Sequence, residues 1–446
     1  MEIFPTPTNQ TRLGFHYFPD TLHYRESDLA AWIPELRALG AAWLVLMASP
    51  DRAIPEPFIR GLVNAGIEPI VHFPMVLPDS VNLEDFTVLL TSYAKWGVHY
   101  VIFFDRPNIR STWQTGAWAQ DELVERFLDR YIPLAETAIN LGLFPVFPPL
   151  EPGGDYWDTA FLQSALTSLQ RRKQQQILDR LVLSAYCWTA EKSLNWGAGG
   201  PEKWKKSHPY FTPSGEEDQR GFRIFDWYLA AVNQALQRDC PIILLGGGAA
   251  GNHTEIPPRP ISPVFHAQVN YTIARLMAGE QTTDPVASDT PLEPVGPGVL
   301  CCGMWLLASA PDSPYAPIAW FQPESQTLPV VGTLKQWFAG HETTPTAHTF
   351  YPRAKGAHPI AHYLLLPLYE WGVADWHLDV IRPFVKKFKP TVGFSLQEAA
   401  NALQVTVVGN ESSFTDEALE MLRKSGSVVE RISGNGTDIA TILAER

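Results

Sequence analysis

The sequence predicts an α/β protein, a (β/α)8 TIM barrel followed by a small C-terminal α/β lobe. Three observations support this prediction. Over the first 340 residues, short apolar runs alternate with helical patterns eight times, as in a parallel sheet with crossover helices. Glycine follows each of the first four helical patterns, where a left-handed residue commonly ends a helix. Beyond residue 341 the composition changes, and shorter β and α patterns follow.

Each barrel strand is expected where an apolar run is bounded by turn residues or helical patterns. The expected strands are residues 13–18, 43–47, 69–73, 100–104, 143–147, 181–186, 241–245 and 299–307. The expected helices are residues 27–39, 57–65, 83–96, 121–141, 158–168, 173–179, 221–237 and 263–277. Ser27 is the expected N-cap of the first helix, because its hydroxyl can accept a backbone N–H. An open doubly wound sheet is the alternative, although no Gly-x-Gly-x-x-Gly follows the first strand.

The chain of 446 residues is too long for one ordinary domain and fits a large domain with a smaller one. We expect a barrel over residues 1–340, a linker and helical segment over residues 341–394, and an α/β lobe over residues 395–446. Residues 358–388 mix apolar and aromatic residues and favour a helix. Within the lobe we expect helices at residues 395–403, 415–424 and 438–445 and strands at residues 404–409 and 428–432.

The charge of the chain argues against two classes of partner. There are 34 Lys and Arg against 47 Asp and Glu, a net charge of −13, which disfavours nucleic acid and an anionic membrane surface. The N-terminal segment has no basic start followed by an apolar run, and no stretch approaches the roughly 20 apolar residues of a membrane helix. The sequence as written is expected in the cytoplasm, and outside the cell only with a missing leader or a non-classical route.

The cysteines and histidines predict neither a metal nor a cofactor. The cysteines are Cys187, Cys240, Cys301 and Cys302, and each lies in or beside an apolar run, so buried free thiols are expected. They form no CxxC pair, and no HxH or HExxH spacing occurs. His16 and His72 lie on expected strands, where a hydrogen-bonded core histidine is the simpler interpretation. A metal site that they share with Asp51 is the alternative.

The end of the fourth expected strand carries the most informative motif. Residues 101–108 read Val-Ile-Phe-Phe-Asp-Arg-Pro-Asn. This segment resembles the end of the fourth barrel strand in the clan A glycoside hydrolases, where Asn-Glu-Pro supplies the acid/base glutamate. Arg106 stands at the position of that glutamate. Because a guanidinium stays charged at neutral pH, it cannot act as the proton donor.

A second replacement falls after the seventh expected strand. The family shows a Thr-Glu-Gly-Gly-like end there, whereas this chain reads Leu-Gly-Gly-Gly over residues 245–248, which puts Gly246 at the nucleophile position. Retaining glycosidases need two carboxylates about 5 Å apart. The resemblance, which covers residues 13 to about 340, therefore implies a glycoside hydrolase-like barrel with both expected glutamates replaced.

The C-terminal lobe carries a separate resemblance. The runs Val-Thr-Val-Val-Gly, Leu-Arg-Lys-Ser-Gly and Val-Glu-Arg-Ile-Ser-Gly, between residues 405 and 434, are similar to one unit of the bacterial cell-wall-binding repeats. This similarity spans roughly 50 residues and implies a bacterial protein. A docked structural lobe is the favoured role, and contacts with protein partners or self-assembly through the lobe are the alternative.

Other carboxylates at the strand ends offer a second route to catalysis. They are Asp20, Asp51, Asp105, Glu151, Asp155 and Glu191. If the protein is an active glycosidase, Asp105, Glu151 and Glu191 are its candidate catalytic residues. Glu151 opens a turn whose Gly-Gly pair allows a ligand to approach the backbone closely. A rigid turn in which Asp155 binds its own backbone is the alternative.

Aromatic residues are frequent, with 15 Trp, and they suit sugar stacking as well as core packing. Long loops are expected after the sixth and seventh strands, at residues 187–220 and 246–262. The residues expected to contact a substrate are His16, Arg106, Asn108, Asp155, Tyr156, Trp157, Trp188 and Trp305. Arg106 has two interpretations, a structural ion pair with Asp105 or Glu151 and a bidentate grip on a carboxylated sugar or other anion.

Three functions follow as expectations. The first is a catalytically degenerate glycosidase-like protein that binds carbohydrate or another small molecule at the barrel mouth, or serves in an assembly. The second is an active glycosidase that uses displaced carboxylates. The third is a purely structural protein, whose mouth is plugged by side chains. The first two differ in whether two carboxyl groups face each other across the mouth at glycosidase separation.

Overall fold

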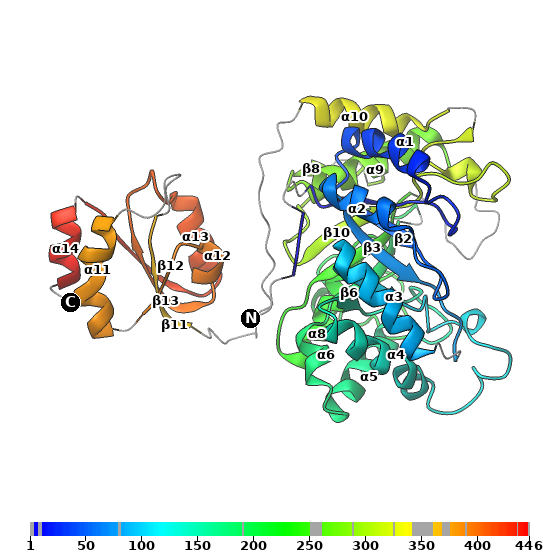
Figure 1. The fold of residues 1–446 in the computed structure, drawn as a ribbon, viewed down its shortest axis with the longest axis horizontal. Coiled ribbons are helices and arrows are strands. Elements are labelled where there is room, and N and C mark those ends of the chain that lie inside the picture. The colour runs from blue at the N-terminus through cyan, green and yellow to red at the C-terminus, as the bar shows by residue number, and fades with distance from the viewer. Residues whose placement is uncertain are drawn as a thin grey trace. The chain divides into compact units, whose positions relative to one another are not determined.

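The computed structural model describes residues 4–7, 11–78, 82–189, 191–249, 261–287, 290–323, 326–340, 360–367, 375–388, 390–434 and 436–444. The chain forms two compact units, Met1–Pro352 and Arg353–Arg446. The elements of both units are labelled in Figure 1, and each unit is described by itself. Most of the expected loop after the seventh strand, residues 250–260, lies outside the described residues.

Eight parallel strands form the barrel of the first unit, which confirms the predicted fold class. Their order is β5-β4-β3-β2-β1-β10-β7-β6, and a parallel bridge between Val146 and Val182 brings the two edge strands together. The strands are β1 (Leu13–His16), β2 (Trp43–Met47), β3 (Glu68–Phe73), β4 (Tyr100–Phe103), β5 (Phe144–Val146), β6 (Leu183–Trp188), β7 (Ile242–Gly248) and β10 (Val299–Met304). A short antiparallel ribbon is added by β8 (Thr282–Thr283) and β9 (Pro291–Leu292).

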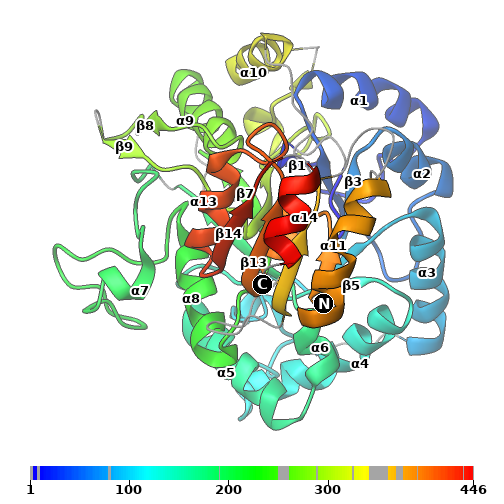
Figure 2. The same ribbon diagram turned by 90° about the vertical axis from the view of Figure 1, so that its left-hand side faces the viewer.

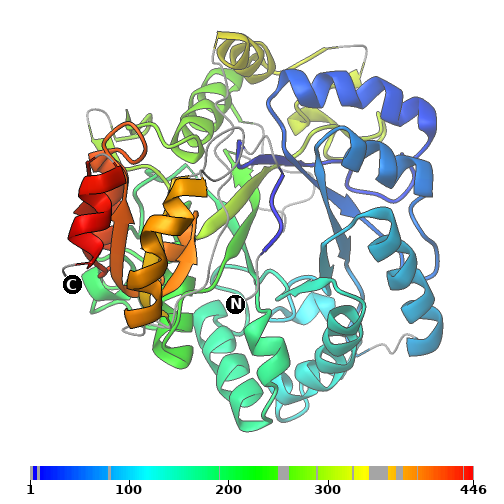
Figure 3. The same cartoon turned by 60° about the vertical axis from the view of Figure 1, so that its left-hand side comes forward.

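Helices surround these strands (Figure 3). The helices of the first unit are α1 (Glu26–Ala38), α2 (Glu56–Asn64), α3 (Leu83–Trp96), α4 (Leu123–Asn140), α5 (Asp158–Arg171), α6 (Gln175–Asp179), α7 (Gly200–Lys203), α8 (Ile224–Leu236), α9 (Pro263–Met277) and α10 (Pro329–Gly340). The short helix α7 lies outside the ring of helices around the strands, in the long loop between β6 and α8 (Figure 2). The predicted cap of α1 is wrong, because the N-cap residue is Arg25 and not Ser27. The Asp28 carboxylate accepts the Arg25 N–H at 2.9 Å, so an acidic side chain in the first turn satisfies the helix end.

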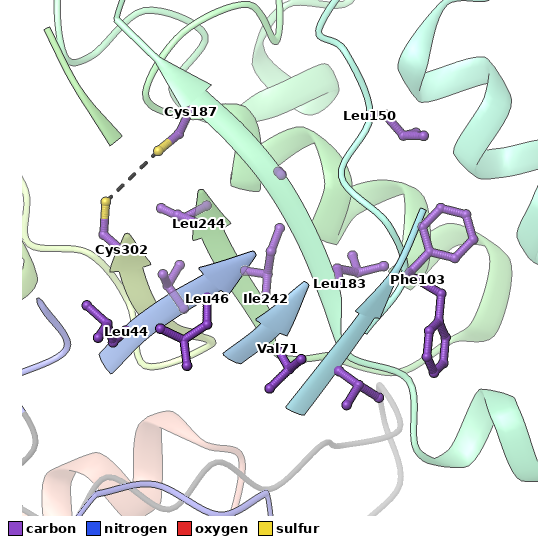
Figure 4. Close-up of a cluster of buried hydrophobic side chains, with 14 of the residues drawn as sticks. Leu44, Leu46, Val71, Phe103, Leu150, Leu183, Cys187, Ile242, Leu244 and Cys302 are labelled. Atoms are coloured by element: carbon purple, nitrogen blue, oxygen red, sulfur yellow. Dashed lines mark hydrogen bonds between the residues drawn. The ribbon is translucent and has the colours of Figure 1, made fainter. Parts of the chain in front are cut away.

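Alternate residues of the strands face two apolar layers, as the strand period requires. On β2, Leu44 and Leu46 pack outward in a layer that also contains the helices, part of which is shown in Figure 4. Trp43 and Val45 instead pack into the barrel interior. The four cysteines are free and buried, as predicted.

The interior is closed at the end where the strands begin. Phe4 packs on Phe144 with ring centroids 5.1 Å apart, and the Tyr100 hydroxyl donates to Pro5 O at 2.7 Å. Bulky side chains therefore fill this end of the barrel. The carboxyl ends of the strands, where the functional residues of such barrels lie, form the opposite end.

The second unit is a four-stranded parallel sheet with the order β12-β11-β13-β14. Its elements are β11 (Ile360–Leu365), α11 (Asp375–Phe388), β12 (Thr391–Gly393), α12 (Leu396–Ala399), β13 (Ala402–Val408), α13 (Asp416–Lys424), β14 (Val428–Ile432) and α14 (Gly436–Ala444). A helix was expected across residues 358–388, but residues 360–365 form the strand β11. Tyr363 and Leu364 are both fully buried and belong to different apolar clusters, so this apolar run has the signature of a strand covered on both faces.

Candidate ligand site at the mouth of the barrel

The candidate site begins where β4 ends. Phe104 and Arg106 have positive φ values of 69° and 46°, which L side chains seldom adopt. The Arg106 N–H donates to Pro149 O at 2.9 Å and fastens this turn to the loop after β5. The local backbone thereby places Asp105 and Arg106 next to Glu151.

These three charged residues form one ion-pair cluster. The Arg106 Nε lies 2.9 Å from Asp105 Oδ2, and its Nη1 lies 3.3 Å from Glu151 Oε2. Side-chain exposure is 19% for Arg106, 16% for Asp105 and 10% for Glu151. The Tyr186 hydroxyl donates to Asp105 Oδ1 at 2.8 Å. Of the two interpretations of Arg106, the geometry shows the structural ion pair, with both carboxylates that the sequence named.

The protonation of the cluster follows from burial and pairing. The pKa of Glu151 lies above its ordinary value, because the effect of burial exceeds the opposite effect of the adjacent Arg106. Burial alone would lower the pKa of Arg106, but Asp105, Tyr186 and Glu151 raise it above its ordinary value. Arg106 is thus a fixed positive charge, and it holds two acidic side chains in a poorly solvated place.

Aromatic rings line the neighbouring strand ends. Trp188 stacks on Tyr186 with centroids 5.0 Å apart and planes 13° apart. Trp305 meets the Trp188 ring edge-on at 6.1 Å and Tyr315 at 5.7 Å. The Arg106 guanidinium lies 5.8 Å from the Tyr186 centroid. Tyr186, Trp188 and Trp305 are only 4–7% exposed, so these rings pack mostly on one another.

The end of β7 leaves no room for a side chain at Gly246. This residue has φ +60°, and a Cβ added to it would lie 2.2 Å from the Trp188 ring. A Cβ on Gly247 would lie 2.5 Å from Cys302 Sγ, and one on Gly248 1.9 Å from Asn270 Oδ1. Each glycine of this run is therefore required by close packing, and an indole ring covers the position that the resemblance assigns to a nucleophile.

Two histidines lie on strands that meet at the mouth. His16 Nε2 accepts the Gly246 N–H at 3.0 Å. Burial and the nearby His72 lower the pKa of His16 to about 3, which fits a neutral acceptor. His72 bonds the Phe104 carbonyl through Nε2 at 3.0 Å and must therefore donate from that atom. Its Nδ1 is buried and has no hydrogen-bond partner among the described residues.

Asn108 lies in the loop after β4 and stabilises the loop after β5 through hydrogen bonds. Its Oδ1 accepts the Glu151 N–H at 2.8 Å, and its Nδ2 donates to Glu151 O and to Tyr156 O, each at 2.9 Å. The residue is fully buried. These bonds hold Glu151 at the mouth and commit both amide hydrogens of Asn108 to the backbone.

The other predicted contact residues lie further along this loop. Tyr156 packs on Phe161. The Trp157 side chain is 7% exposed, and the Trp157 backbone N–H donates to the Tyr210 hydroxyl at 2.9 Å. Asp155 is exposed and accepts the Arg110 N–H at 2.7 Å. The structure thus brings His16, Arg106, Trp188 and Trp305 together at the mouth and places Asn108, Tyr156 and Trp157 in packing contacts beside it.

Glu191 is separate from the ion-pair cluster. It is exposed, lies on the loop after β6 and has φ 63°. Among the described contacts, none joins it to Asp105, Arg106 or Glu151. Of the three candidate catalytic residues, Asp105 and Glu151 therefore share one cation, and Glu191 lies apart from them.

A hollow of about 410 Å³ lies between the loops that follow β1 and β2. It is lined by Thr21, Leu22, Tyr24, Arg25, Met47, Ala48, Ser49, Arg52, Ala53, Ile54 and Pro55. This volume falls in the range of small-ligand sites. None of the three residues of the ion-pair cluster lines it, so this hollow is distinct from the charged centre.

Sequence reasoning missed Tyr186 and Tyr315 at the mouth. Tyr186 binds Asp105, and Tyr315 packs on Trp305. The strand period offered a signal for Tyr186, because it lies two residues before Trp188 and must share its face. Tyr315 lies in a loop after β10, and no local pattern reports where such a side chain points.

The described residues hold no group of three His, Cys, Asp or Glu side chains that is suited to bind a metal ion. In that same part of the chain, no helix is long and apolar enough to cross a membrane.

The sequence matches no protein-family model and no curated protein. Among solved structures, the chain is similar to a family 39 glycoside hydrolase from Bacteroides cellulosilyticus WH2, with 9% identity and a TM-score of 0.47, over 74% of this chain and 64% of that one. It is also similar to a family 128 endo-β-1,3-glucanase from Sorangium cellulosum, with 11% identity and a TM-score of 0.40, over 75% and 99%. A family 5 lichenase from Caldicellulosiruptor sp. F32 shows 11% identity and a TM-score of 0.36, over 76% and 97%.

This chain spans somewhat under two thirds of the length of the family 39 enzyme. At such identities the likeness concerns the barrel fold, and barrels of this kind host many unrelated activities.

Proposed function

We propose that this protein is a glycoside hydrolase-like barrel that binds carbohydrate at the carboxyl ends of its strands and does not cleave it with the usual pair of glutamates. The observation that carries the proposal is the ion-paired Arg106, which stands where the resembled family has its proton donor. Its charge is fixed by Asp105 and Glu151. A leaving sugar would receive no proton from this position.

The packing at Gly246 supports the same proposal from the other side of the mouth. A nucleophile at this position would need a side chain, and the Trp188 ring fills the space into which its first carbon would extend. The Trp188 ring therefore fills the space that a side chain at residue 246 would need to form a covalent glycosyl intermediate. Removing one of the two obstacles leaves the other in place.

Binding is supported by the chemistry that remains exposed. Arg106, Asp105 and Glu151 each keep part of their side-chain surface accessible, and they offer donors and acceptors for hydroxyl groups. Indole and phenol rings with 4–7% exposure lie beside them, and a separate hollow between the loops after β1 and β2 has the volume of a small-ligand site. A sugar is the ligand class that combines stacking with several hydrogen bonds.

A structural or assembly role is the second candidate, and one observation favours it. Tyr186, Trp188 and Trp305 are 4–7% exposed, which is the burial expected of side chains that plug a barrel. In that case the mouth binds no sugar, and the surfaces outside the mouth provide the function.

The test combines calorimetric titration of the purified chain with neutral oligosaccharides and a turnover screen on aryl glycosides. We expect heat of binding and no turnover. Turnover that disappears in Glu151→Gln, while the exposed control Glu191→Gln retains it, contradicts the proposal and assigns catalysis to the displaced carboxylate. The absence of both binding and turnover favours the structural role.

A further inference from the structure

The long loop between β6 and α8 carries a surface that the mouth does not use. We call residues 203–211, which read Lys-Trp-Lys-Lys-Ser-His-Pro-Tyr-Phe, the basic tip. Figure 2 shows α7, which leads into the tip, standing out from the ring of barrel helices. The tip has three lysines and no acidic residue in a chain whose net charge is −13, so its charge is opposite to that of the molecule as a whole.

Two aromatic side chains are exposed at the end of the tip and are held in fixed positions. Tyr210 is 60% exposed and Phe211 63% exposed. The backbones of His208 and Phe211 exchange N–H···O bonds of 2.9 and 3.0 Å, which closes a tight turn. The Tyr210 hydroxyl accepts the Trp157 N–H at 2.9 Å, and the two rings lie 5.4 Å apart. Tyr210 is thereby fixed against the loop that carries Glu151.

A buried carboxylate anchors the base of the tip. Asp218 is 1% exposed and accepts bonds from Trp196 Nε1 at 3.1 Å, Thr212 Oγ1 at 2.8 Å and Arg220 Nε at 2.9 Å. Burial would raise the pKa of Asp218, but these partners outweigh it and lower the pKa. The ionised Asp218 carboxylate therefore connects three parts of the loop by hydrogen bonds and gives the loop a defined shape.

The lysine side chains of the tip are exposed and at most weakly ion-paired. Lys206 is 78% exposed and lies 3.9 Å from Glu216, which is a weak ion pair. Lys203 lies 4.7 Å from the Trp204 ring centroid. Lys205 is exposed and has no ion pair among the described residues. The acidic residues Glu202, Glu216 and Glu217 lie beside the tip and equal its lysines in number, so the positive charge is local to the exposed ammonium groups.

We propose that the basic tip is a second binding surface, for an acidic polysaccharide. Sugar rings stack on exposed aromatic faces, and ammonium groups attract the carboxylates of uronic acid residues. The repulsion from distant acidic residues of the chain is screened beyond about 10 Å at 0.1 M salt, so the exposed ammonium groups of the tip contribute most to the attraction. An anionic membrane suits the tip less, because Tyr210 is tied to Trp157 and its ring is not free to insert.

This inference goes beyond the proposed function of the mouth, because it does not depend on Arg106 or Trp188. The experiment is affinity electrophoresis of the full chain in gels that contain polygalacturonate or neutral dextran. We expect retardation by polygalacturonate alone, and a tenfold or greater loss of affinity when the salt concentration is raised from 20 to 500 mM.

Two tip variants, each with a matched control, locate the surface. Lys205→Glu with Lys206→Glu, and Tyr210→Ala with Phe211→Ala, are each expected to weaken polygalacturonate binding at least tenfold. Lys95→Glu, at an exposed lysine of α3, and Phe394→Ala, at a half-exposed ring of the second unit, are expected to leave it unchanged.

Three results would overturn the proposal. They are the absence of retardation by polygalacturonate, equal retardation by dextran, and binding that the tip variants do not change. Sedimentation with phosphatidylserine vesicles tests the membrane alternative. Tip-dependent binding to these vesicles, without binding to polygalacturonate, assigns the surface to a membrane and rejects the polysaccharide.

Discussion

The two sides of the barrel mouth differ in what occupies the positions that the resemblance assigns to two glutamates. On the side of β4 and β5, a charged side chain is present, but Arg106 has the wrong charge and is held between two carboxylates. On the side of β7, no side chain is present, because the Trp188 ring occupies the space above Gly246. One side is governed by electrostatics and the other by volume, and the two can be perturbed separately.

The largest expected effect is on the volume side. Gly246→Ala adds a Cβ that would lie 2.2 Å from the Trp188 ring at a residue with φ +60°. We expect a loss of about 4 kcal/mol of unfolding free energy, from overpacking and from left-handed strain. Denaturant unfolding measures it.

The matched control for this variant is Gly66→Ala. Gly66 also has positive φ, +78°, but nothing lies within 4 Å of its added Cβ, so only a backbone cost of about 1 kcal/mol is expected. Trp188→Ala should rescue part of the Gly246→Ala loss in a double-mutant cycle. Equal losses in the two glycine variants would show that the indole does not occupy this space.

The next effect is on the electrostatic side. Arg106→Met leaves Asp105 and Glu151 facing each other without their shared cation, and we expect a loss of about 3 kcal/mol. Arg60→Met breaks the half-exposed pair of Arg60 and Glu56 and should cost less than about 1 kcal/mol. Unfolding curves of both variants decide the matter, and similar losses would mean that the mouth cluster is no more than a surface ion pair.

A smaller effect concerns pH at the loop behind Glu151. Asp158 is fully buried, and burial raises its pKa from 3.8 to about 6. Between these values the native state binds more protons than the unfolded state, so this residue's contribution to stability is full below pH 3.8 and is lost as the pH rises through about 6.

The measurement is the difference in unfolding free energy between the wild type and Asp158→Asn at pH 3.5 and pH 7. Relative to the variant, the wild type should lose slightly less than about 3 kcal/mol over this range. The exposed residue Asp312 provides the control Asp312→Asn. A difference that stays constant with pH, or one that grows in favour of the wild type, would contradict the assignment.

The smallest expected effect is at Glu191. Because this residue is exposed and apart from the charged cluster, Glu191→Gln should change the unfolding free energy by less than about 0.5 kcal/mol. It should also leave carbohydrate binding unchanged in calorimetry, whereas Glu151→Gln should weaken it. A strong effect of Glu191→Gln on binding would move the ligand site toward the loop after β6.

The regular part of the fold follows from local patterns in the sequence. The expected bounds of α3 and α9 coincide with the observed ones, because periodicity and end signals agree there. The strand β11 escaped notice because its apolar run does not alternate, and a short run of this kind fits a buried strand and a helix equally well. Only its pairing with β12 and β13 decides the matter.

The candidate site was predictable to a different degree. The sequence indicates Arg106 because this residue replaces an acidic one at a recognisable strand end, and it also indicates Asp105 and Glu151 as its ion-pair partners. The local sequence does not explain why residue 246 is glycine, because the Trp188 ring that covers it belongs to another strand. Asn108 was expected to contact a ligand, but hydrogen bonds to the backbone across 43 residues give it a place in the loop architecture.

The contact between Trp188 and Gly246 also has an evolutionary consequence. A glutamate introduced at residue 246 meets the indole, and one introduced at residue 106 adds a third acid to two that have lost their counter-ion. Each single step toward a hydrolase is harmful until the others have occurred. Such epistasis disfavours single changes, and the introduction of two catalytic glutamates requires several strand ends to be remodelled in one step.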